Sequence, residues 1–231
     1  DMNYLAFVPY EQAVLFSADP STVKYIESED FDFDGGSFKT FEEVGLGGSY
    51  EGLGAVLEVD IHNPGNSSPN YRVIEGNHPG MADSSWDSGR NGFSMEVDFK
   101  MGWNDAGDWY NYTRDFAAKE TYYNVIGRFS SGGAALNIDL SRVTGDTTTT
   151  DQTTELLGNF AGPATAGWDS FEFFPLKDAS GNAVPVKSGG ETTLRLSILP
   201  GSNEDMNYVA FVTSAVQEFP PALVSTEAIA G

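Results

Sequence analysis

Residues 102–113 constrain the fold of this chain more than any other stretch of its sequence. Residues 104–107 carry the Asn, Asp and Gly that favour a turn. Residues 108–113 then alternate between two sides with the period of a β-strand, and aromatic rings occur on both sides. A strand with aromatic residues on both faces is typical of the interior of two packed sheets. The pattern therefore predicts a central strand of a β-sandwich, with Trp103 and Trp109 in its core.

The rest of the chain repeats this alternation between turns. The 231 residues include 26 glycines and 11 prolines, which favour many turns, and 40% hydrophobic residues, which are enough for a core. We expect an all-β domain with extensions, since no segment shows a helical period. Residues 13–16 are interpreted as a short strand or linker, and residues 77–91 and 146–166 as loops. The predicted strands are residues 25–31, 55–61, 93–101, 122–129, 135–140, 168–176, 192–199 and 207–212, with a turn at residues 34–36.

The charge of the chain limits its partners. Its 34 acidic residues against 12 basic ones give a formal charge of −22, which argues against nucleic acid and against an anionic membrane surface. Neutral ligands and divalent cations remain, and an acidic surface suits extracellular surroundings. The absence of cysteine excludes disulfides, thiolate zinc sites and cysteine nucleophiles. No apolar run of about 18 residues occurs, so we expect no insertion into a membrane.

One segment of the sequence occurs twice. Residues 1–8 return as residues 205–212, with seven of the eight positions identical. Such self-similarity indicates a repeated unit, so the first copy is interpreted as the last strand of a preceding module in a tandem array. We therefore divide the chain into a terminal strand with a linker at residues 1–24, a sandwich domain at residues 25–214, and a C-terminal tail at residues 215–231.

Five short motifs occur in an order that is similar to one known family. They are the strand at residues 26–31, the Asn70-Tyr71-Arg72 segment followed by Glu75-Gly76, residues 102–113, the loop at residues 166–171 and the closing strand at residues 207–211. In these motifs the chain resembles the family 6 carbohydrate-binding modules, which are jelly-roll β-sandwiches of the galactose-binding-like type. The resemblance implies two antiparallel sheets and sugar binding without catalysis. The chain departs from the family in the loops at residues 77–91 and 146–166, and in Tyr208, where the family commonly has tryptophan.

A sugar site needs aromatic platforms for the apolar ring faces and amides or carboxylates for the hydroxyl groups. Carried over position by position, the resemblance implies that Tyr71 and Trp168 form two aromatic walls. It places Asn207 as the amide at the floor and Asn70 at the rim. Each of these residues has a structural alternative. Aromatic residues in loops often only pack, and Asn207 recurs as Asn3, which fits a strand-end amide equally well.

A metal site is also predicted. Glu27 and Glu29 are two residues apart, which places both carboxylates on one face of the predicted strand. Carboxylate oxygens suit calcium far better than zinc. The family often carries a structural calcium ion (Ca2+) there, and Asp205, beside the closing strand, is a candidate third ligand. The alternative is that these acidic residues belong to the solvated surface.

Two functions follow from these patterns. The first is non-catalytic binding of a polysaccharide or oligosaccharide by a secreted bacterial module, extracellular or at the cell surface, attached to a polysaccharide-degrading enzyme. The second is a structural repeat of a surface adhesin or extracellular filament, in which neighbouring copies of the module join through strands. The sequence shows no serine-centred elbow, phosphate loop or histidine-based triad, so we do not expect an enzyme.

Overall fold

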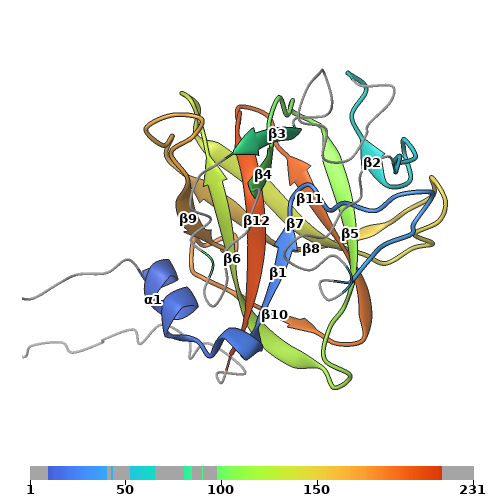
Figure 1. The fold of residues 1–231 in the computed structure, drawn as a ribbon, viewed down its shortest axis with the longest axis horizontal. Coiled ribbons are helices and arrows are strands. Elements are labelled where there is room, and N and C mark those ends of the chain that lie inside the picture. The colour runs from blue at the N-terminus through green and yellow to red at the C-terminus, as the bar shows by residue number, and fades with distance from the viewer. Residues whose placement is uncertain are drawn as a thin grey trace, which may run out of the picture.

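The computed structural model describes residues 10–40, 43, 53–65, 81–84, 90 and 98–214. Within these residues nearly all regular structure is β-strand (Figure 1). No helix in this part of the chain has the length and apolar character needed to cross a membrane. The elements are α1 (Tyr10–Ser17), the 3-10 helix η1 (Pro20–Thr22), β1 (Val23–Glu27), β2 (Ile61–His62), β3 (Met81–Ser84), β4 (Asp98–Met101), β5 (Trp109–Asp115), β6 (Thr121–Ser130), β7 (Leu136–Val143), β8 (Thr154–Gly162), β9 (Glu172–Pro175), β10 (Pro185–Ser188), β11 (Glu191–Ile198) and β12 (Asp205–Thr213).

The strands form two sheets. Among the described residues, one sheet has seven strands in the order β10-β6-β12-β4-β3, with β1 also paired to β12 and β9 to β6. The other sheet has five strands in the order β2-β5-β11-β7-β8. The pairings between these strands are antiparallel. The prediction of an all-β sandwich of two antiparallel sheets is confirmed.

The main core lies between the two sheets. Phe129 and Phe211 of the seven-stranded sheet share one apolar cluster with Tyr110 and Phe160 of the five-stranded sheet, and all four are fully buried. The rings of Phe129 and Phe160 meet edge to face at 5.2 Å between centroids, a favoured arrangement of aromatic pairs. This core fixes β5, β6 and β12, and therefore the ends from which the neighbouring loops leave.

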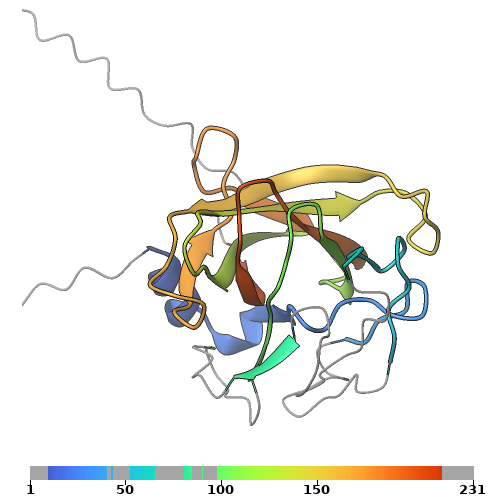
Figure 2. The same ribbon diagram turned by 90° about the horizontal axis from the view of Figure 1, so that it is seen from above.

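A smaller apolar cluster covers the outer face of the seven-stranded sheet. Leu15 of α1 is fully buried there against Tyr25, Tyr208 and Ala210. Figure 2 shows α1 at the periphery of the strands. The prediction of a short strand or linker at residues 13–16 is wrong, because these residues are part of α1. With only eight residues, the helix is too short to leave a periodic signal in the sequence.

β8 lies inside the predicted loop at residues 146–166, and this prediction is also wrong. β8 is an edge strand of the five-stranded sheet, and its only fully buried large side chain is Phe160. Backbone pairing with β7 therefore forms this strand with little help from alternation of apolar residues. The sequence analysis also did not predict the short strands β3, which lies inside the predicted loop at residues 77–91, and β10.

Residues 55–61 do not form the predicted strand, because only Ile61–His62 is strand. The Asp60 carboxylate accepts backbone hydrogen bonds from Gly35 at 3.0 Å, Gly36 at 2.6 Å and Val56 at 2.7 Å. These contacts fold the segment into turns around a buried carboxylate. The turn predicted at residues 34–36 is confirmed.

Candidate functional site

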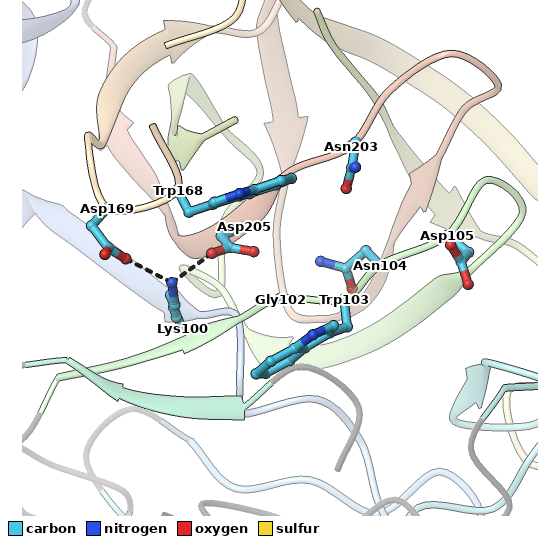
Figure 3. Close-up of a pocket in the computed structure, with 9 residues that line it drawn as sticks. All are labelled: Lys100, Gly102, Trp103, Asn104, Asp105, Trp168, Asp169, Asn203 and Asp205. Atoms are coloured by element: carbon cyan, nitrogen blue, oxygen red, sulfur yellow. Dashed lines mark hydrogen bonds and ion pairs between the residues drawn. The ribbon is translucent and has the colours of Figure 1, made fainter. Parts of the chain in front are cut away.

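Three loops meet and enclose a cleft of about 490 Å³ (Figure 3). The first loop joins β4 to β5, the second precedes β9, and the third precedes β12. Buried strands hold the bases of these loops, so a rigid scaffold frames the cleft. The residues that line it are Lys100, Gly102, Trp103, Asn104, Asp105, Trp168, Asp169, Asn203 and Asp205.

Trp168 forms one wall of the cleft and is 40% exposed. The loop that carries it is tied to the end of β6. The Ser130 hydroxyl donates a hydrogen bond to the Trp168 carbonyl, and the backbone N–H of Ser131 donates to the Thr165 hydroxyl at 2.8 Å. The indole packs directly against Gly132, where any Cβ atom would overlap the ring. The backbone at Gly132 therefore holds the Trp168 ring in a fixed position at the edge of the cleft.

Trp103 lies across the cleft from Trp168 and is 74% exposed (Figure 3). Its φ of 53° is in the left-handed region that favours glycine, so this large residue has an unfavourable backbone conformation. The prediction that Trp103 lies in the core is wrong. The residue stands after the end of β4 and before β5, and so takes no part in the alternation of either strand.

The charged part of the cleft centres on Lys100. Its ammonium nitrogen lies 2.8 Å from a carboxylate oxygen of Asp169 and 2.6 Å from one of Asp205. Burial lowers the pKa of Lys100, but the two carboxylates together raise that pKa above its ordinary value, so the ammonium group stays charged. Burial raises the pKa of Asp205, and Lys100 opposes that rise. Asp105 also lines the cleft, which thus holds three carboxylates and one ammonium group.

Buried hydrogen bonds fix Asn104 beneath the cleft. Its side-chain nitrogen donates to the Glu204 carbonyl at 2.9 Å, and its side-chain oxygen accepts from the Tyr110 hydroxyl at 2.9 Å. The side-chain nitrogen of Asn63 donates in turn to the Tyr110 oxygen at 3.1 Å. Asn203, by contrast, is exposed in the lining of the cleft (Figure 3). Asn203 is therefore the amide that a ligand reaches most readily.

Glu204 stands in the sequence between the cleft residues Asn203 and Asp205, and it is fully buried. Burial raises the pKa of its carboxyl group to about 8, and the negative charge of Asp205 contributes to the rise. The group is therefore mainly protonated at neutral pH. The third loop therefore contains a neutral, buried carboxyl group, and Glu204 adds no fourth negative charge to the cleft.

Asn207, the predicted floor of the sugar site, does not line the cleft. It is fully buried within β12. Its side-chain oxygen accepts a hydrogen bond from Arg128 at 2.7 Å, and its nitrogen donates to the Asp98 carboxylate at 2.8 Å and to the Phe99 carbonyl at 2.9 Å. These bonds occupy the oxygen and both hydrogens of the amide. In this structure Asn207 has the structural role that the sequence left open as its alternative.

Of the other predicted site residues, the structure places Trp168 in the cleft wall, whereas Tyr71 and Asn70 lie outside the described residues. Their positions relative to the cleft stay a prediction. Sequence reasoning missed Trp103 and Asn203 as cleft residues. The available signal was their place in loops, since Trp103 stands between a strand and a turn and Asn203 follows Gly and Ser before the closing strand.

The three predicted calcium ligands do not form a shared site. Arg90 pairs with Glu27, with the Arg90 Nε atom 2.8 Å from a carboxylate oxygen, and Lys100 pairs with Asp205. Glu29 is fully buried. Over the described ranges, no three His, Cys, Asp or Glu side chains are grouped as metal ligands. Because two of the three carboxylates hold a cationic side chain, this set does not fit a calcium ion.

Trp109 occupies a different environment, on the face of the five-stranded sheet that points away from the core. The guanidinium carbon of Arg195 lies 3.7 Å from the centre of its ring, and the His62 ring stacks at 6.2 Å. Arg195 also donates to the side-chain oxygens of Asn111, at 2.9 Å, and Gln152. The prediction of a core position is wrong for Trp109 as well, because it is half-buried beneath a cation.

Comparison with known proteins gives structural similarities only. Neither a protein-family model nor a curated protein matches the chain. CsCBM6-3 from Clostridium stercorarium, solved with cellobiose, is 14% identical, with 83% of this chain and 94% of that chain covered and a TM-score of 0.44. The module CBM6cm-2 of Cellvibrio mixtus lichenase 5A, solved with cellotriose, is 14% identical (58% and 86% covered, TM-score 0.42). A β-1,3-glucan-binding CBM6 from Bacillus halodurans is 20% identical (57% and 84% covered, TM-score 0.41). The solved structures to which this chain is similar are thus mainly carbohydrate-binding modules of family 6, the family that its sequence motifs resemble.

Proposed function

We propose that this domain binds a neutral polysaccharide or oligosaccharide, without catalysis, in the cleft between Trp103 and Trp168. The observation that carries the proposal is the placement of two exposed indole rings on opposite sides of one cleft (Figure 3). Sugar rings present apolar C–H faces that pack on aromatic rings. A segment of sugar chain between Trp103 and Trp168 meets an indole on each side.

Polar groups in the lining of the cleft suit the hydroxyl groups of a sugar. The exposed amide of Asn203 both donates and accepts hydrogen bonds, and the exposed carboxylate of Asp105 accepts them. Asn104 is buried beneath them, and its hydrogen bonds with Tyr110 and the Glu204 carbonyl hold the loop in position. The volume of about 490 Å³ is in the usual range of ligand sites, roughly 300–1,000 Å³, and suits a short segment of a glycan.

The charge of the site favours neutral glycans over anionic ones. Asp105, Asp169 and Asp205 line the cleft with Lys100 as the counter-charge, and the whole chain carries a formal charge of −22. An anionic polysaccharide is therefore repelled both locally and at long range, most strongly at low ionic strength. Neutral chains rely on stacking and hydrogen bonds, which this charge does not oppose.

Binding accounts for the cleft better than the alternatives do. Asp169 and Asp205 are held by Lys100 at 2.8 Å and 2.6 Å, which ties both carboxylates to one cation and supports a binding role over acid–base chemistry. A purely structural repeat gives no role to the open rings of Trp103 and Trp168. The proposal includes a secreted location, extracellular or at the cell surface, where the module holds a larger protein close to a polysaccharide.

Isothermal titration calorimetry with soluble glycans tests this function. The panel begins with cello-oligosaccharides, xylo-oligosaccharides and β-1,3-glucan, continues with mannan and galactan, and includes polygalacturonate as an anionic contrast. We expect one class of neutral glycan to bind. Trp168→Ala should weaken binding by about 30-fold, because truncating an aromatic anchor costs about 2 kcal/mol.

Trp109→Phe is the matched control, since it changes a tryptophan outside the cleft and keeps an aromatic ring under Arg195. This variant should bind as the parent protein does. Failure of the whole neutral panel to bind, or an unchanged affinity of Trp168→Ala, refutes the proposal.

A further inference from the structure

β12 is the strand that the N-terminal sequence repeats. Residues 1–8 match residues 205–212 except for Leu5, which replaces Val209. Residues 1–8 lie outside the described residues, but β12 shows what each of the repeated residues does when the sequence forms a strand. Of residues 205–212, Asp205 lines the cleft, but the inference below does not depend on the proposed sugar binding.

β12 is an interior strand with both edges and both faces covered. It pairs antiparallel with β6 along one edge and with β1 and β4 along the other. Met206, Val209 and Phe211 enter the main core, while Tyr208, Ala210 and Val212 join the outer apolar cluster. Its residues are buried from Asp205 to Val212, so this sequence is suited to the middle of a sheet.

Three β12 residues also make polar or cation–π contacts that need specific partners. Asp205 pairs with Lys100 at 2.6 Å, and Asn207 accepts from Arg128 at 2.7 Å. The Tyr208 ring lies 4.8 Å from the guanidinium carbon of Arg90. The repeat keeps all three as Asp1, Asn3 and Tyr4. A buried carboxylate and a buried amide are costly without partners, so the repeat matches a complete slot with its polar contacts as well as its apolar ones.

Chain direction is also compatible with this slot. Val212 pairs with Val23, at the start of β1. A strand of residues 1–8 in the place of β12 brings Val8 to the position of Val212, and residues 9–22, which contain α1 and η1, connect it to Val23. The copy then pairs with β1 in the same antiparallel sense as β12 does.

We propose that residues 1–8 are an interchangeable β12 strand, which fits between β1 and β6 in a sandwich of this fold. The partner of this segment is therefore a domain with the same β1, β4 and β6 surfaces. A strand at the boundary between two neighbouring copies can then complete the sheet of one of them. The joint between copies is a complete interior strand with ladders on both edges, which is a far larger contact than strand addition at an exposed sheet edge.

A double-mutant cycle in the full chain tests whether the segment fits. Val209→Asp places a carboxylate in the main core, which β12 cannot tolerate. If residues 1–8 replace the damaged strand, Val209→Asp keeps a cooperative thermal unfolding transition. Leu5→Asp alone leaves the transition unchanged, and the combination Val209→Asp with Leu5→Asp loses it. Amide hydrogen exchange followed by mass spectrometry should show protection of residues 1–8 gained in Val209→Asp and absent from the double variant.

Two results overturn the proposal. One is loss of the unfolding transition in Val209→Asp while Leu5 is intact. The other is equal stability of Val209→Asp with and without Leu5→Asp, which shows that the N-terminal copy does not enter the slot. Matched Asp substitutions at corresponding positions make the comparison independent of the chemistry of the new side chain.

Discussion

Two places in this molecule combine tryptophan with amide and charged side chains, and only one of them is open. In the cleft, Trp103 and Trp168 are 74% and 40% exposed, and Lys100 is held aside by Asp169 and Asp205. On the five-stranded sheet, by contrast, Arg195 lies directly over Trp109, 3.7 Å from the ring centre.

The two cations also bind different partners. The ammonium group of Lys100 is paired with the carboxylates of Asp169 and Asp205. Arg195 has no carboxylate among its described hydrogen-bond partners and instead donates to Asn111 and Gln152. Burial lowers the pKa of Arg195 to about 10, so the group still carries its charge at neutral pH and binds the ring as a cation. The same residue types therefore line an open cleft in one place and make a structural contact on the sheet in the other.

The strongest test of this contrast substitutes each tryptophan and compares the loss of glycan binding with the loss of stability. Trp103→Gly should weaken glycan binding by about 30-fold, because it removes an aromatic anchor worth about 2 kcal/mol. It should leave the free energy of unfolding almost unchanged, since the ring is 74% exposed and glycine suits a φ of 53°. Trp109→Ala should do the reverse and lower the free energy of unfolding by about 2 kcal/mol through the lost cation–π contact and burial. Calorimetry and urea unfolding measure the two quantities.

A crossed result would break the comparison. If Trp109→Ala abolishes binding while remaining folded, or if Trp103→Gly unfolds the protein, the assignment of the two tryptophans is reversed.

A second test changes the packing of Trp168 against Gly132 and removes no aromatic ring. Gly132→Ala forces the indole to move, because the new Cβ atom overlaps it. Overpacking of this kind costs about 1–3 kcal/mol, so we expect binding to weaken by about tenfold. Gly167→Ala is the control in the same loop, since the nearest atom to its Cβ position lies 3.9 Å away. Equal affinities of the two variants would show that packing against Gly132 does not position the Trp168 ring for binding.

The last test concerns the buried carboxyl group under the cleft. Burial raises the pKa of Glu204 from 4.5 to about 8, so its contribution to stability is complete below about pH 4.5 and is lost as the pH rises through about 8. One pKa unit corresponds to about 1.4 kcal/mol, so we expect the free energy of unfolding to fall by up to about 2 kcal/mol between pH 6 and 8. Glu204→Gln should flatten this decline in urea unfolding.

Asp32 serves as the internal reference in that experiment. Burial raises its pKa from 3.8 to about 6, so its contribution falls between about pH 4 and 6, and above pH 6 the remaining decline belongs to Glu204. In Glu204→Gln a decline between pH 4 and 6 should therefore remain, while the decline between pH 6 and 8 is lost. An equally steep decline above pH 6 in the variant would assign the effect to another group.

The fold was largely predictable because its signals are local. The Asn-Asp-Ala-Gly turn and the alternation that follows it predict a central strand, and β5 confirms it, although the side chains that enter the core are Tyr110 and Tyr112 and not Trp109. β8 and α1 were missed for a common reason. Each depends on contacts with distant parts of the chain, β8 on backbone pairing with β7 and α1 on packing of Leu15 against β12 and β1.

The candidate site was predictable only in part. Trp168 was expected in a loop and lines the cleft, whereas Trp103 was assigned to the core and Asn207 to the cleft floor. A sequence motif gives the type of residue at a position but not the direction of its side chain. A left-handed backbone at Trp103 and three buried hydrogen bonds to Asn207 decided those directions.

The sequence by itself determined the class of fold, the strong negative charge that disfavours anionic partners, and the repeat of the β12 strand. These properties are set by local periodicity, by composition and by self-similarity, none of which needs a distant contact. Only the tertiary structure decided which tryptophans are open. Trp103 has a left-handed backbone after β4 and is 74% exposed, whereas Arg195 covers the ring of Trp109, and the chain brings such partners together only when it folds.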